Sequence, residues 1–93
     1  MFEPTLNRMR LISCREKLSI TKQVAAKRMH MSQPAYLRYE SGSRSPSIHV
    51  IQTMADILCT SVEYLTGKTD IEAPNSYLIT KSAEPELFRM IDI

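Results

Sequence analysis

Residues 21–42 read TKQVAAKRMHMSQPAYLRYESG, and this stretch decides the fold. Ala25, Ala26 and Met29 recur at helical spacing, so they share one face of a short helix that ends at Met29. Thr21 precedes this helix, and its hydroxyl can accept a hydrogen bond from an open backbone N–H group of the first turn. The small alanine side chains allow a second helix to approach closely.

A second helix follows after residues 30–31. Two residues are too few for any connection other than a tight turn. Tyr36 and Tyr39 are three residues apart and therefore lie on one face of this helix. Ser32 is a favourable cap for its first turn, and Gly42 is a favourable stop. Two short helices joined by a tight turn, with small residues where they cross, indicate a helix-turn-helix.

Further helices are predicted on both sides of this stretch. Leu11, Cys14 and Leu18 repeat at the spacing of an amphipathic helix, which we expect from residue 6 to about residue 17. We expect Leu18 and Ile20, in the connection that follows, to point into the core. Two more helices are expected after serine caps, at residues 48–58 after Ser47 and at residues 62–66 after Ser61.

The composition indicates one small all-α domain. The chain has 93 residues, no Trp and only two Gly, and helix-forming residues dominate. No apolar run approaches the length of a membrane span, and the N-terminus does not resemble a signal peptide, so we expect a cytoplasmic protein. Cys14 and Cys59 are too few for a disulfide framework or a metal set, and we expect two free, largely buried thiols.

Charge is distributed unevenly along the chain, although the net charge is only +2. Residues 1–50 hold nine Lys and Arg against three Glu, whereas residues 51–93 hold three Lys and Arg against seven Asp and Glu. Such a distribution could also arise if these charges simply face solvent and have no binding role. Because the basic half contains the helix-turn-helix pattern, we interpret it as the side that faces a polyanion.

The residues of this stretch also resemble a known family. The order and spacing of nine or more positions are similar to those of the phage-repressor/Cro-like (XRE-type) helix-turn-helix regulators. The resemblance covers about residues 6–67 and implies a lambda-repressor-like five-helix DNA-binding domain. The positions that carry it are Ile20-Thr21, Ala26, Met31-Ser32, Tyr36, Glu40-x-Gly42, Pro46 and Leu65-Thr66-Gly67.

The resemblance gives roles to residues that periodicity leaves undefined. It implies that Arg15 pairs with Glu40, in a bidentate contact that would fix the first helix against the third. His30 and Cys59 stand where the family usually has Gly, so both are expected in the left-handed backbone region. A metal role for His30 is disfavoured because no second ligand lies near it in the sequence. Lys22 replaces a customary Gln.

In this family the third helix, here about Gln33-Ser41, enters the major groove of double-stranded DNA. The resemblance implies base contacts from its outward residues Gln33, Pro34, Leu37 and Arg38. Pro34 stands where the family usually has a small polar residue. Because proline has no hydrogen-bonding side chain, we expect fewer base contacts than are usual in the family. Phosphate contacts are expected from Thr21, Lys22, Ser32, Ser41, Ser43 and Arg44, with Arg10 as a further contact from the first helix.

The remainder of the chain is predicted to be an appendage. Residues 1–67 form the DNA-binding domain, residues 68–75 a linker, and residues 76–93 a tail with a short strand and an amphipathic helix. An isolated strand and a short helix are only marginally stable, so the apolar side chains of this tail need a partner surface to pack against. We expect a second copy of the chain to provide it, in a homodimer on two half-sites.

Two alternatives remain open. The chain could be an antitoxin-like or other protein-binding helix-turn-helix module that uses residues 76–93 to hold a protein partner. An enzyme is a weaker alternative. The sequence offers only one weak candidate for a nucleophile and its base, namely Cys14 with His30 or His49. We therefore predict a transcriptional regulator, most simply a repressor, with no catalytic residues, no cofactor, no metal and no membrane partner.

Overall fold

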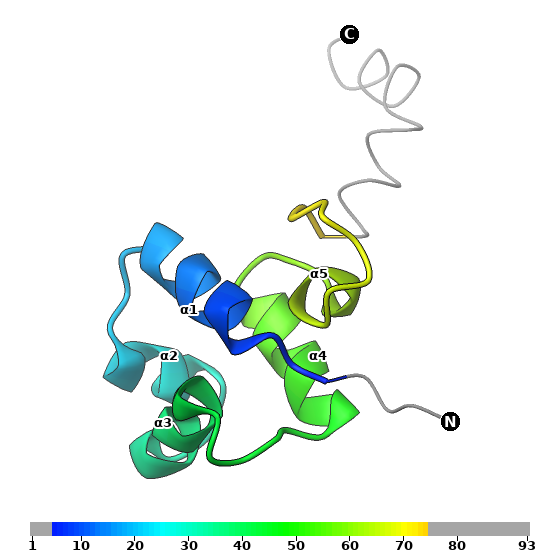
Figure 1. The fold of residues 1–93 in the computed structure, drawn as a ribbon. Helices are drawn as coiled ribbons and strands as arrows, with labels where there is room; N and C mark the ends of the chain where they lie inside the picture. Colours follow the sequence, from blue (N-terminus) through cyan, green and yellow to red (C-terminus); the bar gives the residue numbers. More distant parts are fainter. Residues whose placement is uncertain (1–4, 75–93) are drawn as a thin grey trace, which may run out of the picture.

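The computed structural model describes residues 5–74, which are all-helical and contain no strand. This confirms the predicted all-α, five-helix architecture (Figure 1). None of these helices is long and apolar enough to cross a bilayer. The predicted strand and helix at residues 76–93 lie outside the described residues. The helices are α1 (Arg8–Lys17), α2 (Lys22–Arg28), α3 (Gln33–Ser41), α4 (Ile48–Ile57) and α5 (Val62–Leu65).

Each helix begins after a side chain that caps its first turn. Thr21 Oγ1 accepts a hydrogen bond from the backbone N–H of Val24 at 3.1 Å. Ser47 and Ser61 cap α4 and α5 in the same way, as predicted. The prediction was wrong for the start of α1, which begins at Arg8, because the side chain of Asn7 accepts from two N–H groups. Local capping chemistry thus sets every helix start.

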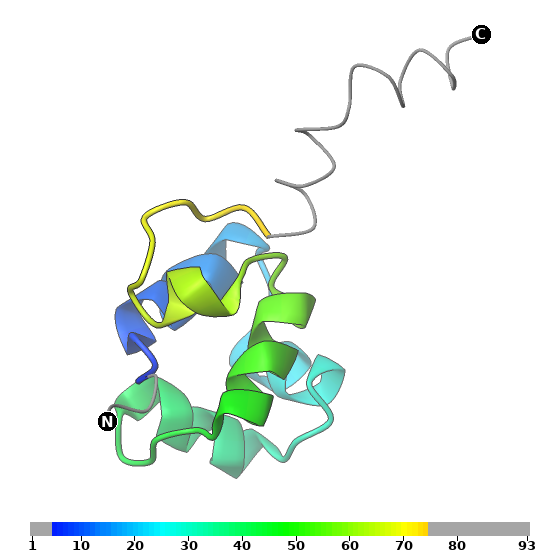
Figure 2. The same ribbon diagram turned by 90° about the vertical axis from the view of Figure 1, so that its right-hand side faces the viewer.

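The helices pack around one core. α3 packs against α2 and α1, and α5 packs against both α1 and α4. Figures 1 and 2 both show α1 beside α5 on one side of the molecule, with the α2–α3 pair on the other side. Tyr36, Leu11 and Ile51 are completely buried at the centre. The third helix is therefore held from its inward face by the whole domain.

Three helix ends use a residue other than glycine in the left-handed region. His30 and Cys59 follow α2 and α4 with φ of 58°, as the resemblance implied. Ser19 follows α1 with φ of 57°, which the sequence analysis did not predict. At each point the chain reverses direction immediately after the helix, and this allows the short connections that the domain needs.

Two predictions of burial were wrong. Cys14 is buried as expected, and burial raises the pKa of its thiol, but Cys59 is exposed. Because Cys59 adopts the left-handed conformation after α4, the chain turns there and its side chain faces solvent. Leu18 is 38% exposed, although it continues the apolar stripe of α1. It is the residue that ends α1, and the left-handed Ser19 directs the chain away from the core immediately afterwards.

Residues 68–72, which we call the return segment, fold back against the domain. The sequence predicted them to be part of a linker. Lys17 forms an ion pair with Glu72, and the hydroxyl of Thr60 donates to the Glu72 carbonyl. The segment therefore continues the folded unit beyond α5, alongside α1.

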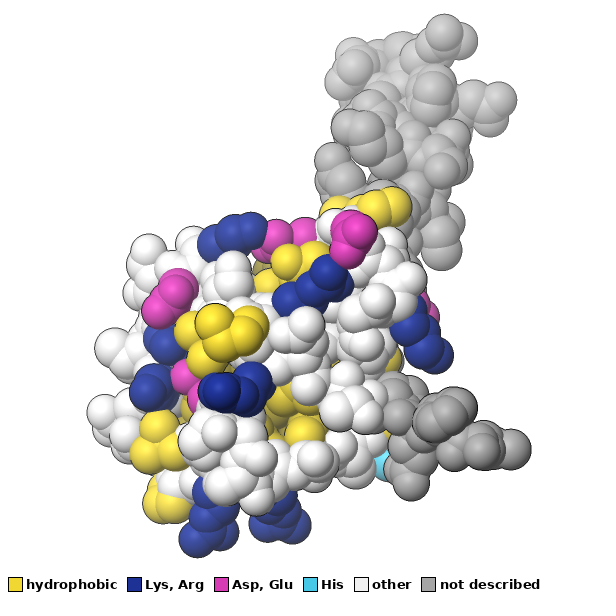
Figure 3. Space-filling model, viewed as in Figure 1, with side chains coloured by type: hydrophobic (Ala, Val, Ile, Leu, Met, Phe, Trp, Pro, Cys, Tyr) yellow, Lys and Arg dark blue, Asp and Glu magenta, His cyan; other side chains and the backbone are white. Residues whose placement is uncertain are grey.

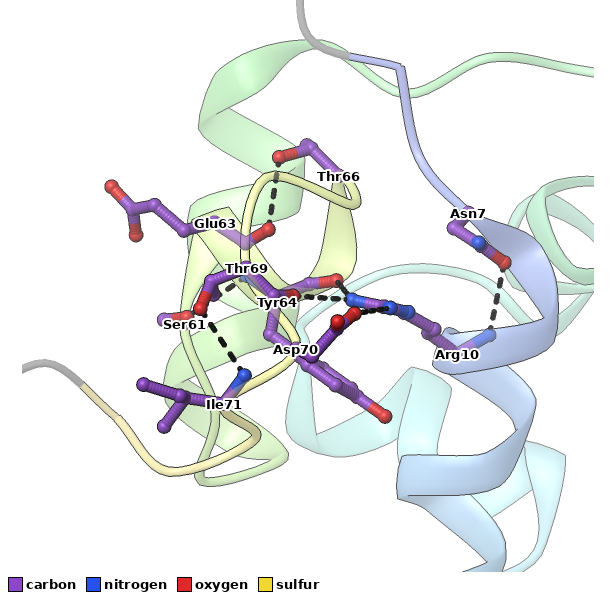
Figure 4. A network of polar contacts seen from close by, with 9 residues as sticks. All are labelled: Asn7, Arg10, Ser61, Glu63, Tyr64, Thr66, Thr69, Asp70 and Ile71. Atoms are coloured by element: carbon purple, nitrogen blue, oxygen red, sulfur yellow. Dashed lines mark hydrogen bonds and ion pairs between the residues drawn. The ribbon is translucent and has the colours of Figure 1, made fainter.

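Arg10 is the main attachment point of the return segment, as Figure 4 shows. One guanidinium nitrogen donates to the carbonyls of Tyr64 at 2.8 Å and Thr69 at 2.6 Å. The other donates to the Asp70 carboxylate at 2.7 Å. The guanidinium carbon also lies 4.3 Å from the centre of the Tyr64 ring, within cation–π distance. Arg10 therefore joins α1 to α5 instead of remaining available for a phosphate, contrary to the prediction.

Candidate nucleic-acid interface

The outward face of α3 carries the four predicted base-reading residues. Gln33 and Pro34 lie in its first turn, and Leu37 and Arg38 lie one turn later; all four are exposed. Pro34 costs the helix nothing, because an N–H in the first turn has no intrahelical partner. Ser32 Oγ accepts from the backbone N–H of Ala35 at 3.2 Å and fixes this end of the helix.

Two of the predicted phosphate contacts lie at the start of α2, the helix that packs against α3. Thr21 caps α2 and Lys22 is its first residue, and both are exposed. In the cap the Thr21 oxygen acts as an acceptor, which leaves its hydroxyl proton free to be donated. The partial positive charge of the helix start and the Lys22 ammonium both favour an anion at this position.

The residues after α3 form a small hydrogen-bonded group. Ser41 Oγ donates to the Arg38 carbonyl at 3.1 Å and lies 3.1 Å from Ser43 Oγ. The backbone N–H of Arg44 also donates to the Arg38 carbonyl, at 3.3 Å. The loop is therefore closed onto the end of α3, and it presents the exposed Arg44 side chain beside that helix.

The cationic side chains of α1 and those around α3 differ in their contacts. On α1, Arg8, Arg10 and Arg15 all donate hydrogen bonds to other parts of the chain. On the α2–α3 side, the charged ends of Lys22, Arg38 and Arg44 have no hydrogen bond or ion pair among residues 5–74. Figure 3 shows Lys and Arg side chains, without Asp or Glu, along the lower edge where α3 lies in Figure 1.

A buried ion pair holds α3 against α1. Arg15 Nε donates to Glu40 Oε2 at 2.6 Å, which confirms the pairing that the resemblance implied, although through one hydrogen bond rather than a bidentate contact. The side chains are only 11% and 5% exposed. Burial by itself lowers the pKa of Arg15, but the hydrogen bond and charge of Glu40 outweigh it and raise that pKa above its usual value. Arg15 also donates to the Ile20 carbonyl at 2.9 Å, so the pair fixes the entry to α2 as well.

Arg8 contributes to the position of α3 and was missed by the sequence analysis. Its guanidinium donates to the Glu40 carbonyl at 3.0 Å. Gly42 ends α3 with φ of 83°, and a side-chain carbon there would lie 3.1 Å from the Arg8 side chain. The left-handed backbone therefore favours Gly42, and a larger residue there would also displace the Arg8 side chain slightly. No local pattern could have indicated this, because the two residues lie on different helices.

Tyr36 places a buried hydroxyl beside the Arg15–Glu40 pair. Burial, followed by the nearby Glu40 carboxylate, raises the pKa of this phenol above its usual range. Among the described residues the hydroxyl has no partner in hydrogen-bonding geometry. A buried hydroxyl without a partner costs about 1–3 kcal/mol.

We therefore expect Tyr36→Phe to leave the free energy of unfolding unchanged or to raise it by about 1 kcal/mol. Urea denaturation followed by circular dichroism measures this. Tyr36→Ala, which empties the same site, is the matched comparison and should cost about 3–5 kcal/mol. A clear loss of stability in Tyr36→Phe would mean that the hydroxyl does make a stabilising hydrogen bond.

The sequence matches the family described as Helix-turn-helix over residues 11–65, more than half of the chain. The chain belongs to the XRE-type helix-turn-helix family. The matched region runs from the buried Leu11 of α1 to the buried Leu65 of α5 and therefore contains the whole core. Members of this family are DNA-binding domains of transcription regulators and are typically not enzymes.

A curated protein supports the same assignment for this helix-turn-helix chain. It is 29% identical over 86 residues to the uncharacterized HTH-type transcriptional regulator YqaE of Bacillus subtilis (strain 168). The similarity covers 80% of this chain and 74% of that protein. No solved structure matches the chain significantly. Membership of the family supports DNA binding in transcription regulation.

Proposed function

We propose that this chain is a sequence-specific regulator that binds double-stranded DNA as a homodimer and acts as a repressor in the cytoplasm. In this proposal α3 enters the major groove and α2 crosses above the phosphate backbone. The similarity to phage repressors supports the repressor role. The proposal rests on the exposed cations Lys22, Arg38 and Arg44 around α3. Within residues 5–74 they have no hydrogen-bond or ion-pair partner, whereas the arginines of α1 are already hydrogen-bonded.

The proposed base contacts follow from the exposed face of α3. Arg38 can donate two hydrogen bonds to O6 and N7 of guanine, and Gln33 can pair with N6 and N7 of adenine. Leu37 and Pro34 offer apolar surface, which suits a thymine methyl group. Each bidentate contact discriminates between bases by about 1–3 kcal/mol. The sequence preference is therefore assigned mainly to Gln33 and Arg38.

The proposed phosphate contacts surround these base contacts. Thr21, Lys22 and Ser32 lie at helix starts, where backbone N–H groups face outward. Arg44, with Ser41 and Ser43, lies beyond the other end of α3. Such contacts fix the register of the protein on the duplex and contribute most of its salt-dependent affinity.

Lys22→Ala should reduce the salt dependence of DNA binding. We expect the slope of log K against log salt for a random-sequence duplex to become shallower by about 1, because one phosphate contact is lost. Fluorescence anisotropy at several salt concentrations measures this slope. Lys68→Ala removes an equal charge from the return segment and should leave the slope unchanged. Equal slopes for all three proteins, or no binding at low salt, would contradict the proposed interface.

We propose a homodimer because a single domain of this size contacts only a short stretch of DNA, which is too little surface for tight specific binding. Two half-sites about 34 Å apart allow each α3 to enter the same face of the duplex. Analytical ultracentrifugation should show two chains on one palindromic duplex. A single chain on that duplex at every protein concentration would contradict the homodimer without excluding DNA binding.

A further inference from the structure

A pocket of about 250 Å³ lies between the α2–α3 turn and α4. Met29, His30 and Met31 line it from the turn, and His49 lines it from the first turn of α4. Val50 and the Tyr39 ring add apolar surface, and Thr53 and Tyr39 each add a hydroxyl group. Among residues 5–74, no Asp, Glu, Lys, Arg or Cys lines this pocket. Its possible ligand atoms are therefore imidazole nitrogens, thioether sulfurs and two neutral hydroxyl oxygens, and none of these side chains carries a negative charge.

This donor set favours one chemical class of metal ion. Thioether sulfur is a soft ligand that selects Cu(I), whereas Mg²⁺ and Ca²⁺ require carboxylate or carbonyl oxygen. Within the described chain, no group of three or more His, Cys, Asp and Glu side chains could hold a metal ion, so the usual tetrahedral zinc set is absent there. We propose that the pocket binds a soft monovalent cation, Cu(I), through His30, His49 and at least one of the two methionines.

The two imidazoles are available for this role. His30 and His49 are exposed, and their ring nitrogens form no hydrogen bond or ion pair among residues 5–74. The side-chain hydrogen bond that His49 receives within residues 5–74 goes to its backbone carbonyl, from the hydroxyl of Thr53 at 3.2 Å.

The fold also supplies the ligand that the sequence lacked. A metal role for His30 was disfavoured because no second ligand lies near it in the chain. In the structure, α4 brings His49 to the same pocket, nineteen positions further along the sequence. A metal ion here would connect the α2–α3 turn directly to α4.

The test is a titration with Cu(I), in competition with a colorimetric Cu(I) chelator under anaerobic reducing conditions. The exposed Cys59 thiol would compete for a soft ion, so the titration uses the Cys59→Gly protein. Glycine suits the φ of 58° at this position. Resonances of ¹³C-labelled methionine methyl groups, with Ag(I) as a redox-stable probe, report which sulfur atoms bind.

We expect one metal equivalent to shift the methyl resonances of Met29 or Met31 or both. His49→Ala and the double variant Met29→Leu/Met31→Leu should each weaken Cu(I) binding by about tenfold or more. Met9→Leu is the matched control, because Met9 is an exposed methionine on α1 outside the pocket, and it should have no effect. Unchanged Cu(I) affinity in a His30→Ala/His49→Ala protein would overturn the proposal. Zn²⁺ binding as tight as Cu(I) binding, and insensitive to Met29→Leu/Met31→Leu, would also overturn it.

Discussion

Glu40→Ala should lower the free energy of unfolding by about 3–5 kcal/mol, because it leaves the buried Arg15 guanidinium without its carboxylate. A domain of this size has a total stability of about 5–15 kcal/mol, so the variant should be largely unfolded at moderate urea concentrations. The backbone carbonyl of Glu40 still accepts from Arg8, so the substitution isolates the ion pair. Urea denaturation at neutral pH measures the change.

Two further variants distinguish the loss of the Arg15–Glu40 ion pair from the general effect of removing a charged side chain. Glu16→Ala removes an exposed carboxylate from α1, next to Arg15 in the sequence, and should change stability by less than about 0.5 kcal/mol. Arg15→Met combined with Glu40→Met replaces both charges with apolar groups and should restore most of the loss, because neither partner remains buried and unpaired. If Glu40→Ala is no worse than Glu16→Ala, the pair does not hold α1 against α3.

Replacing both Gln33 and Arg38 by alanine should abolish most sequence discrimination. With about 1–3 kcal/mol for each bidentate contact, the preference for a selected site over random duplex should fall by about 30-fold to about 20,000-fold. The operator is first obtained by selection from a random library with the wild-type protein. Competition binding then compares the selected and random duplexes for each variant.

The control for this prediction is Gln52→Ala combined with Lys68→Ala. It removes an amide from α4 and a positive charge from the return segment, both exposed and both away from α3. Its discrimination should match the wild type. Because Gln33 and Arg38 are exposed, their loss should not change the urea midpoint, so weaker discrimination cannot come from unfolding. Unchanged discrimination in the Gln33→Ala/Arg38→Ala protein would place base reading on other residues.

Features that depend on neighbouring residues were predictable from the sequence. The caps at Thr21 and Ser32 follow from a side chain and the N–H groups a few residues later, and both are observed. The left-handed conformation of His30 and the Arg15–Glu40 pair came from the family resemblance rather than from periodicity. The exposure of the predicted base-reading residues followed from the helical period of α3.

Features that depend on distant residues were not predictable. Arg10 and Asp70 are sixty positions apart, and a polar stretch after α5 gives no sign that it will return to α1. The apolar stripe of α1 correctly predicted Leu11 and Cys14 but failed at Leu18, because a left-handed Ser19 turns the chain there. Helical periodicity assumes that the helix continues, and it carries no information about where the chain turns.

The contacts of Arg10 also determine how this domain should be excised for experiments. A fragment cut at residue 65, where the family match ends, would remove the Thr69 carbonyl and the Asp70 carboxylate that hold its guanidinium. It would also remove Glu72, the partner of Lys17 and Thr60. The shortest piece that keeps every one of these attachments extends through residue 72. Crystallisation or NMR samples designed on the family boundary alone would carry an exposed, unsatisfied edge along α1 and α5.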